Sequence, residues 1–294
     1  MSSSPHVIAL HGGAGVIPGR DYREATEHLR DLAARMSAKL ADGLAAVDAV
    51  EIAVVEMEAS GLYVAGRGSA PNAKGLVEMD ASIMDGARHK AGAVCAIRDA
   101  ASPIAVARRV MEATPHVLLA GQGASDFARE QRLEQILDPE SFFRMPVGIT
   151  AADIEAETQA LAHGTVGAVA LDLKGGLAAA TSTGGVFGKR PGRVGDTPLP
   201  GAGVWADDEV AVSCTGVGEF FILTAAAFDV AARRRYIGAS LQEACQGMID
   251  SVGNLGGDGG VIAVNRAGEV AFVFNSPGMK RAAAGSAFES WGRV

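Results

Sequence analysis

The sequence predicts an α/β protein in which two β-sheets lie face to face, with helices on their outer sides. Strand-like runs come in groups, and helix-like tracts stand beside these groups. A regular alternation of one strand and one helix, which would indicate a single parallel sheet, is not seen. No internal repeat of 20 to 50 residues is visible, so a solenoid or propeller is not expected. The chain has 294 residues, which fits one large domain.

The first half begins with a strand and continues with two helices. The run "HVIAL" predicts a buried strand that leads into the glycine turn "HGGAG" at residues 12–15. Residues 21–43 place apolar side chains at helical spacing and end at a glycine. Residues 48–60 predict a second helix. Strands are then expected at "EMDASIMDG" (78–86) and "AGAVCAI" (91–97), before a helix that starts at Ser102-Pro103 and runs to Met111.

The second half follows a different segment, residues 132–164. This segment contains two prolines and a polar helical tract without a clear apolar stripe, so we interpret it as a linker. Strands are then predicted at 165–172, 176–185 and 209–219, and residues 260–274 form a hairpin that turns at 266–268. Helices are expected over residues 219–238 and 240–252.

Composition and charge exclude several classes of function. Apolar residues make up 48% of the chain and charged residues 20%, which is typical of a globular protein and not of a disordered one. The net charge is −8, and no basic stripe with interleaved aromatic residues is present. We therefore expect a small-molecule substrate and no nucleic-acid partner.

The cysteines and the N-terminus indicate a cytoplasmic protein. Cys95, Cys214 and Cys245 are odd in number and far apart, so neither a disulfide framework nor a zinc site is predicted. The N-terminal segment has no basic region and only a short apolar run, which does not match a secretion signal. No run approaches the roughly 18 apolar residues of a membrane span, so no membrane association is expected.

The dipeptide Gly164-Thr165, just before a predicted strand, is the first candidate for chemistry. A threonine hydroxyl is a weak nucleophile unless a base takes its proton. If the Gly164-Thr165 bond is cut, Thr165 gains a free α-amino group, whose reference pKa of about 7.7–8.0 makes it a base near neutral pH. On its own, Gly-Thr before a strand is more often a purely structural feature.

Three further polar, glycine-flanked segments accompany it. "TSTGG" ends a strand with hydroxyl groups, among them Thr183. "GRVGD" carries opposite charges, Arg193 and Asp196, on one short turn. "SCTGVGE" ends an apolar strand at Thr215-Gly216, whose hydroxyl and N–H groups are suited to stabilise an oxyanion.

Taken together, these segments resemble the plant-type asparaginase and isoaspartyl peptidase family of N-terminal nucleophile hydrolases. The resemblance extends over nearly the whole chain, because "HGGAG", "GRGS", "EMDASIMDG", "GTVGAVALD", "TSTGG", "PGRVGD", "PGAG", "SCTGVGE" and "GGDGGVIAV" follow one another in the family's order. It implies a four-layer αββα sandwich and a single domain, residues 1–294. It also implies self-cleavage into an α piece (1–164) and a β piece (165–294).

The resemblance further implies a hydrolase of L-asparagine and of β-aspartyl dipeptides. Thr165 would be the nucleophile and form an acyl-enzyme, Thr183 would orient it, and Thr215 and Gly216 would hold the oxyanion and contact the substrate. Arg193 would bind the substrate's α-carboxylate and Asp196 its α-ammonium, with Gly218 also in the binding site. Because an α-peptide would leave part of this clamp unpaired, we expect selectivity for β-linked aspartyl groups.

Several further expectations depend on the resemblance alone. No cofactor is implied for catalysis, but one loop is similar to a loop that holds a sodium ion through backbone carbonyls. Here its ligands would be Met57, Glu58, Ser60, Tyr63, Ala65 and Arg67. The chain departs from the family at "YVAG", where Val64 replaces an asparagine. A homodimer of αβ units is also implied.

Two other hypotheses remain open at this point. The chain could be a small-molecule binding protein of the same fold that never cuts itself, or a threonine endopeptidase that acts on proteins. Retention of Thr165, Thr183 and Thr215 argues against a pure binding protein. The charged pair Arg193 and Asp196, which suits a free amino-acid end, argues against an endopeptidase. The sequence does not rank asparagine against β-aspartyl dipeptides.

Overall fold

The computed structural model describes residues 4–155 and 164–294, which form two β-sheets packed face to face. The strands of the larger sheet are β1 (Val7–His11), β2 (Met79–Asp85), β3 (Lys90–Ile97), β4 (Leu118–Ala120), β5 (Val166–Leu171), β6 (Leu177–Thr183), β11 (Arg281–Gly285) and β12 (Phe288–Arg293). Within the described residues their spatial order is β12-β11-β1-β5-β6-β2-β3-β4. Neighbouring strands are antiparallel except β3 and β4, which are parallel. Strand β1, from the start of the chain, therefore lies between β11, from the end of the chain, and β5 in the same sheet.

The smaller sheet comes wholly from the second half of the chain. It consists of β7 (Val204–Ala206), β8 (Val210–Gly216), β9 (Gly259–Asn265) and β10 (Val270–Phe274). The order β10-β9-β8-β7 is antiparallel throughout. The turn between β9 and β10 is the hairpin predicted from the sequence.

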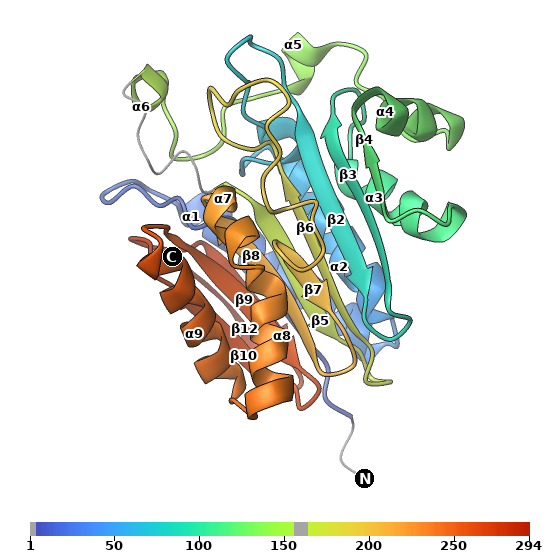
Figure 1. Ribbon diagram of the computed structural model, residues 1–294, viewed down its shortest axis with the longest axis vertical. Helices are drawn as coiled ribbons and strands as arrows, with labels where there is room; N and C mark the ends of the chain where they lie inside the picture. The colour runs from blue at the N-terminus through green and yellow to red at the C-terminus, as the bar shows by residue number, and fades with distance from the viewer. Residues whose placement is uncertain (1–3, 156–163) are drawn as a thin grey trace.

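Helices cover the outer face of each sheet (Figure 1). The larger sheet packs against α1 (Arg23–Ala41), α2 (Ala46–Ser60), α3 (Pro103–Ala113) and, at its edge, α4 (Gly121–Glu130). The smaller sheet packs against α8 (Ala226–Ile237) and α9 (Leu241–Asn254), which follow the short helix α7 (Gly218–Leu223). In Figure 1, α8 and α9 lie on the near side of the two sheets and α2 lies on the far side. None of the helices within 4–155 and 164–294 is long and apolar enough to cross a membrane.

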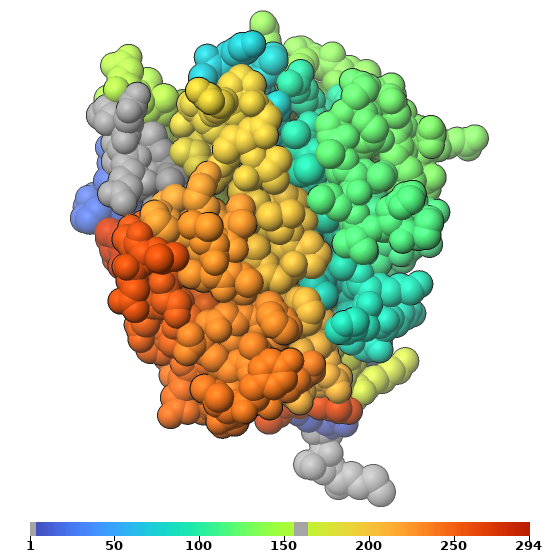
Figure 2. Space-filling model, viewed as in Figure 1, coloured from blue at the N-terminus to red at the C-terminus, as the bar shows by residue number. Residues whose placement is uncertain are grey.

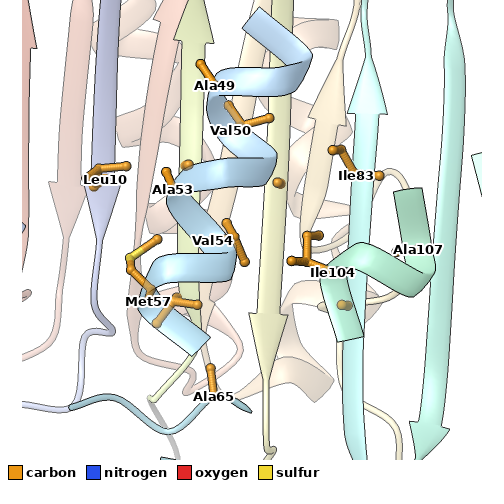
Figure 3. Close-up of a cluster of buried hydrophobic side chains, with 14 of the residues drawn as sticks. Leu10, Ala49, Val50, Ala53, Val54, Met57, Ala65, Ile83, Ile104 and Ala107 are labelled. Carbon is orange, nitrogen blue, oxygen red and sulfur yellow. The ribbon is translucent and has the colours of Figure 1, made fainter. Parts of the chain in front are cut away.

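Three apolar cores lie between the four layers, one at each contact between neighbouring layers. The outer core of the larger sheet is shown in Figure 3, where Val54 of α2 and Ile104 of α3 face a sheet that contributes Leu10 and Ile83. A second core lies between the smaller sheet and helices α8 and α9. The third contains inward-facing residues of both sheets, for example Val169 of β5 and Ile262 of β9 with many small side chains. The predicted αββα sandwich is confirmed.

The helices and strands predicted along the chain are present with two differences, and the structure adds strands β4, β7, β11 and β12 to them. The helix expected over residues 219–238 is divided into α7 and α8, because Ala225 between them has a left-handed backbone with φ +49°. Ser102 precedes α3 as expected, yet its side chain does not cap the helix. Instead, the buried carboxylate of Glu58 accepts a hydrogen bond from the N–H of Ile104 in the first turn (3.1 Å) and another from the Ser102 hydroxyl.

The predicted linker, residues 132–164, is described only up to residue 155 and again at Gly164. The first part contains the short helices α5 (Pro139–Phe142) and α6 (Ala151–Glu155). Residues 156–163 of the predicted linker lie outside the described residues. The space-filling view shows the loop of residues 184–203, in yellow, beside the orange segment that contains α7 (Figure 2). These two segments carry most of the predicted substrate-binding residues.

Candidate active site

Thr165 lies immediately before β5, in a row of polar residues that crosses the larger sheet. Val166 pairs with Ser182 of β6, and Thr183 of β6 pairs with Asp80 of β2. This register places Thr165 opposite Thr183. Directly opposed residues project to the same face of a sheet. Val166 packs in the outer core, so Thr165, Thr183 and Asp80 face the smaller sheet, and all three are buried.

The hydroxyl and carbonyl groups of Thr165 each have a neighbour from a distant part of the chain. Its Oγ1 lies 3.5 Å from Oγ1 of Thr197, and its carbonyl oxygen lies 3.0 Å from Nδ1 of His11. A carbonyl oxygen only accepts hydrogen bonds, so Nδ1 of His11 carries the proton. Burial lowers the pKa of His11 to about 3, so the ring is neutral. Neither His11 nor Thr197 was singled out from the sequence.

The side chain of Val64 packs against Gly164 and leaves no room for a larger residue there. A Cβ atom on Gly164 would overlap the side chain of Val64, which is itself buried. The backbone of Val64 also accepts a hydrogen bond from the N–H of Gly184 (2.8 Å), just after Thr183. Val64, the position at which the chain departs from the family pattern, thus packs directly against the predicted cleavage dipeptide.

Thr215 and Gly216 are the last two residues of β8, a strand of the smaller sheet. Val212 and Cys214 of β8 belong to the core between the smaller sheet and helices α8 and α9. The alternate residues Ser213 and Thr215 therefore point the other way, toward the larger sheet. The Thr215 hydroxyl accepts a hydrogen bond from the N–H of Ala14 (3.3 Å) and keeps its own proton available to donate. This orientation suits the predicted oxyanion-binding residue.

Arg193 and Asp196 lie together beside the start of α7. The guanidinium Nε and Nη2 of Arg193 donate to the two carboxylate oxygens of Glu219, at 2.8 and 2.7 Å. Asp196 is buried, and its Oδ2 has no hydrogen-bond partner in the described part of the chain. Burial raises the pKa of Asp196 to about 7, although nearby Arg193 lowers it. A Cβ atom on Gly218 would lie 2.7 Å from Oδ1 of Asp196, so this position has room for glycine only.

Glu219 is the member of this group that the sequence analysis missed. Its carboxylate pairs with Arg193 in a bidentate geometry, which would equally suit the substrate carboxylate that we assigned to Arg193. The only signal in the sequence was its place in "SCTGVGE", next to Gly218. Arg193 therefore has a carboxylate partner before substrate binds, while Oδ2 of Asp196 has no cationic partner among residues 4–155 and 164–294.

The six predicted sodium ligands lie on the turn from the end of α2 to Gly68. The carbonyls of Met57, Ala65 and Arg67 accept hydrogen bonds from the Ser60 hydroxyl and from the N–H groups of Gly68 and Arg144. A carbonyl oxygen has a second lone pair, so these bonds leave an acceptor site on each. The Glu58 side chain points instead to Ser102 and Ser182. Backbone oxygens are suitable ligands for a hard cation, so the loop is compatible with sodium binding.

Side-chain metal ligands do not form a cluster elsewhere in the described part of the chain. No group of three or more histidine, cysteine, aspartate or glutamate residues that could hold a metal ion occurs among residues 4–155 and 164–294. The three cysteines are free and buried.

The arrangement combines a buried threonine, hydroxyl groups around it and a carboxylate with an unpaired oxygen. A threonine freed at its α-amino group contains both nucleophile and base. Thr215 presents a hydroxyl donor on the facing sheet, and Arg193 with Asp196 offers opposite charges to a zwitterionic ligand. This set of groups suits acyl transfer from an amino-acid substrate.

Comparison with known proteins is consistent with this geometry. The family model described as Asparaginase matches residues 4–146 and 140–290. An isoaspartyl peptidase of Salmonella typhimurium is 44% identical over 94% of this chain and 94% of its own length, and one of Escherichia coli is 44% identical over 94% and 92%. A plant-type L-asparaginase of Pyrobaculum calidifontis is 42% identical over 93% and 95%. The chain belongs to the asparaginase family.

Proposed function

We propose that the chain cuts itself between Gly164 and Thr165 and then hydrolyses the side-chain amide of L-asparagine and the isopeptide bond of β-aspartyl dipeptides. The observation that carries this proposal is the position of Thr165, buried opposite Thr183, in a fold whose substrate clamp leaves the Oδ2 of Asp196 unpaired within the described residues. The names of the relatives, isoaspartyl peptidase and L-asparaginase, support the same chemistry.

In the self-cleavage step, Oγ1 of Thr165 attacks the carbonyl carbon of Gly164. A C–O bond forms and the C–N bond to Thr165 breaks, which gives an ester and transfers a proton to the α-amino nitrogen. Water then hydrolyses the ester, leaving the carboxylate of Gly164 and the free hydroxyl of Thr165. The products are an α piece of residues 1–164 and a β piece of residues 165–294.

In the hydrolytic reaction, the neutral α-amine of Thr165 accepts the hydroxyl proton as Oγ1 attacks the substrate carbonyl. The negative charge that develops on the carbonyl oxygen is stabilised by Thr215 and Gly216. Collapse of this intermediate releases ammonia or an amino acid, and water then attacks the acyl-enzyme to release aspartate. Thr183 holds the nucleophile in orientation, and we assign the same task to Thr197, whose hydroxyl lies 3.5 Å from Oγ1 of Thr165.

Substrate recognition depends on charge at both ends of the clamp. Asp196 neutralises the α-ammonium, which supplies the cation that its Oδ2 lacks within the described residues. Arg193 binds the α-carboxylate, either in exchange for Glu219 or through the N–H groups that Glu219 leaves unused. Gly218 keeps the space beside Asp196 open.

Four further proposals concern the state of the protein. The backbone carbonyls of the loop from Met57 to Arg67 bind a structural sodium ion, and catalysis needs no cofactor. Two αβ units assemble as a homodimer. The protein works in the cytoplasm, where its three buried cysteines stay reduced.

Amide hydrolysis is tested with three substrates and one variant. The wild-type protein is expected to release ammonia from L-asparagine and leucine from β-Asp-Leu, while α-Asp-Leu is cleaved far more slowly. Thr165→Ala should abolish all of these activities. Equal rates on the α- and β-linked dipeptides would contradict the clamp, and hydrolysis by Thr165→Ala would contradict the nucleophile.

A further inference from the structure

His11, the last residue of β1, joins the two sheets at the position of Thr165. Its Nδ1 donates to the carbonyl oxygen of Thr165 (3.0 Å), and its Nε2 lies 2.7 Å from the hydroxyl of Ser213 on β8. Since Nδ1 carries the proton, Nε2 is the acceptor and the Ser213 hydroxyl is the donor. His11 and Ser213 are both fully buried. The ring is therefore held at both nitrogens in one tautomer and one orientation.

The neighbouring strand leaves space for this contact. Gly167 pairs with His11 across β5 and β1. A Cβ atom on Gly167 would overlap both the Nε2 atom of His11 and the Ser213 hydroxyl. Any larger residue would displace the ring, so the second glycine of "GTVGAVALD" is explained by the hydrogen bond between His11 and Ser213. This observation is independent of the hydrogen-bond distances.

The same segment is tied to the oxyanion side of the site. Ser213 lies two residues before Thr215 on the same face of β8. Three residues after His11, the N–H of Ala14 donates to the Thr215 hydroxyl (3.3 Å). The end of β1 and the turn after it thus contact the carbonyl of Thr165 at one point and β8 at two points.

We propose that His11 is a positioning residue, which fixes the backbone of the nucleophile Thr165 relative to the strand that carries Thr215. The inference rests on the proposed function, because it concerns the distance between nucleophile and oxyanion donor in that reaction. His11 does not touch the reacting atoms. It acts through the carbonyl of Thr165, and a small displacement of a nucleophile is enough to lower the rate of the chemical step.

Two substitutions separate the two hydrogen bonds of His11. In His11→Asn the side-chain amide nitrogen occupies about the place of Nδ1, so it can still donate to the Thr165 carbonyl. In His11→Gln the amide group reaches about the place of Nε2, so the contact with Ser213 is kept and the donor to Thr165 is lost. His28→Asn and His28→Gln serve as matched controls, because His28 of α1 makes one comparable contact, from Nδ1 to the Tyr63 hydroxyl (3.0 Å).

The readouts are completeness of self-cleavage, kcat and KM for β-Asp-Leu per mature site, and Tm. We expect His11→Gln to lower kcat about tenfold or more relative to His11→Asn, since one buried hydrogen bond is worth about one factor of ten or more. KM should stay within about twofold, because Arg193 and Asp196 are unaltered. Arrest of His11→Gln as a single chain, with normal cleavage of His11→Asn, would equally support the inference. The His28 variants should match the wild type.

Equal kcat values for the Asn and Gln variants at similar Tm would overturn the inference while leaving the proposed function intact. Equal losses of activity that follow equal losses of Tm would also overturn it, because they would reduce His11 to a structural residue. If the wild-type protein hydrolyses neither L-asparagine nor β-Asp-Leu, the proposed function itself fails, and this inference fails with it.

Discussion

Replacing Asp196 with asparagine removes the buried carboxylate that we assign to the substrate's α-ammonium. Asp196 is 3% exposed, and its Oδ2 has no partner in the described ranges 4–155 and 164–294. Asparagine has nearly the same shape but no charge, so the change isolates the electrostatic contribution. Removing one partner of a buried ion pair costs about 3–5 kcal/mol, which corresponds to a loss of about a hundredfold to a few thousandfold in kcat/KM.

The pH dependence gives a second, independent signature. Burial raises the pKa of Asp196 to about 7, and only its ionised form binds the ammonium, so this contribution to kcat/KM is present above pH 7 and is lost as the pH falls below it. The α-amine of Thr165, with a reference pKa of about 7.7–8.0, must also be neutral. The wild-type acid limb should therefore reach a limiting slope of about two, and that of Asp196→Asn about one.

The assay compares L-asparagine with succinamate, which has the amide and the carboxylate but lacks the α-ammonium. Wild-type protein should prefer L-asparagine strongly, and Asp196→Asn should lose most of that preference. Asp208→Asn is the matched control, since Asp208 is exposed. The reasoning is refuted if Asp196→Asn lowers activity on both substrates by the same factor, or if its acid limb keeps the wild-type slope.

Three other substitutions test neighbouring parts of the account. Glu219→Gln should lower KM for L-asparagine about threefold or more at unchanged kcat, because the neutral amide competes less well for Arg193; a higher KM in steady-state kinetics would contradict this. Gly164→Ala should slow self-cleavage in a time course by gel, because its Cβ atom overlaps Val64, and adding Val64→Ala should restore part of the rate; no rescue would argue against the overlap. Glu58→Gln should remove a pH dependence of stability. Burial raises the pKa of Glu58 from 4.5 to about 7, so its contribution is fully present below pH 4.5 and is lost as the pH rises through 7. Urea unfolding is compared in the Thr165→Ala background, which stays a single chain. With Glu58 intact this chain should lose about 2–3 kcal/mol of stability relative to the same chain with Glu58→Gln between pH 5 and pH 8, and a pH-independent difference would refute this.

The elements with strong local patterns were predictable from the sequence. The helices α1 and α2 show regular apolar spacing, and β5 and β8 are runs of apolar residues that end at polar turns. Strands β4, β7, β11 and β12 were not predicted. Two of them have only three residues, and β11 (Arg281–Gly285) is rich in alanine, which has little preference for strands. These strands exist because neighbouring strands complete their hydrogen bonds.

Candidate site residues could be proposed from the sequence where each lies in a short segment with a recognisable pattern. Thr165, Arg193, Asp196 and Thr215 were all proposed from short segments, and their roles stay predictions. His11 was not, because its partner Ser213 is 202 positions away in the sequence. The pairing between Arg193 and Glu219 likewise depends on how the loop of residues 184–203 folds back against α7. A local pattern contains no information on such contacts.

The most direct test of the account is the intact mass of the purified protein after incubation at neutral pH. We predict two fragments, one that ends at Gly164 and one that begins at Thr165 with a free α-amino group. Thr165→Ala should remain a single chain under the same conditions. A wild-type chain that persists at 30.0 kDa would contradict the N-terminal nucleophile, and the fold would then serve as a binding protein in which Thr165 stays locked in the chain.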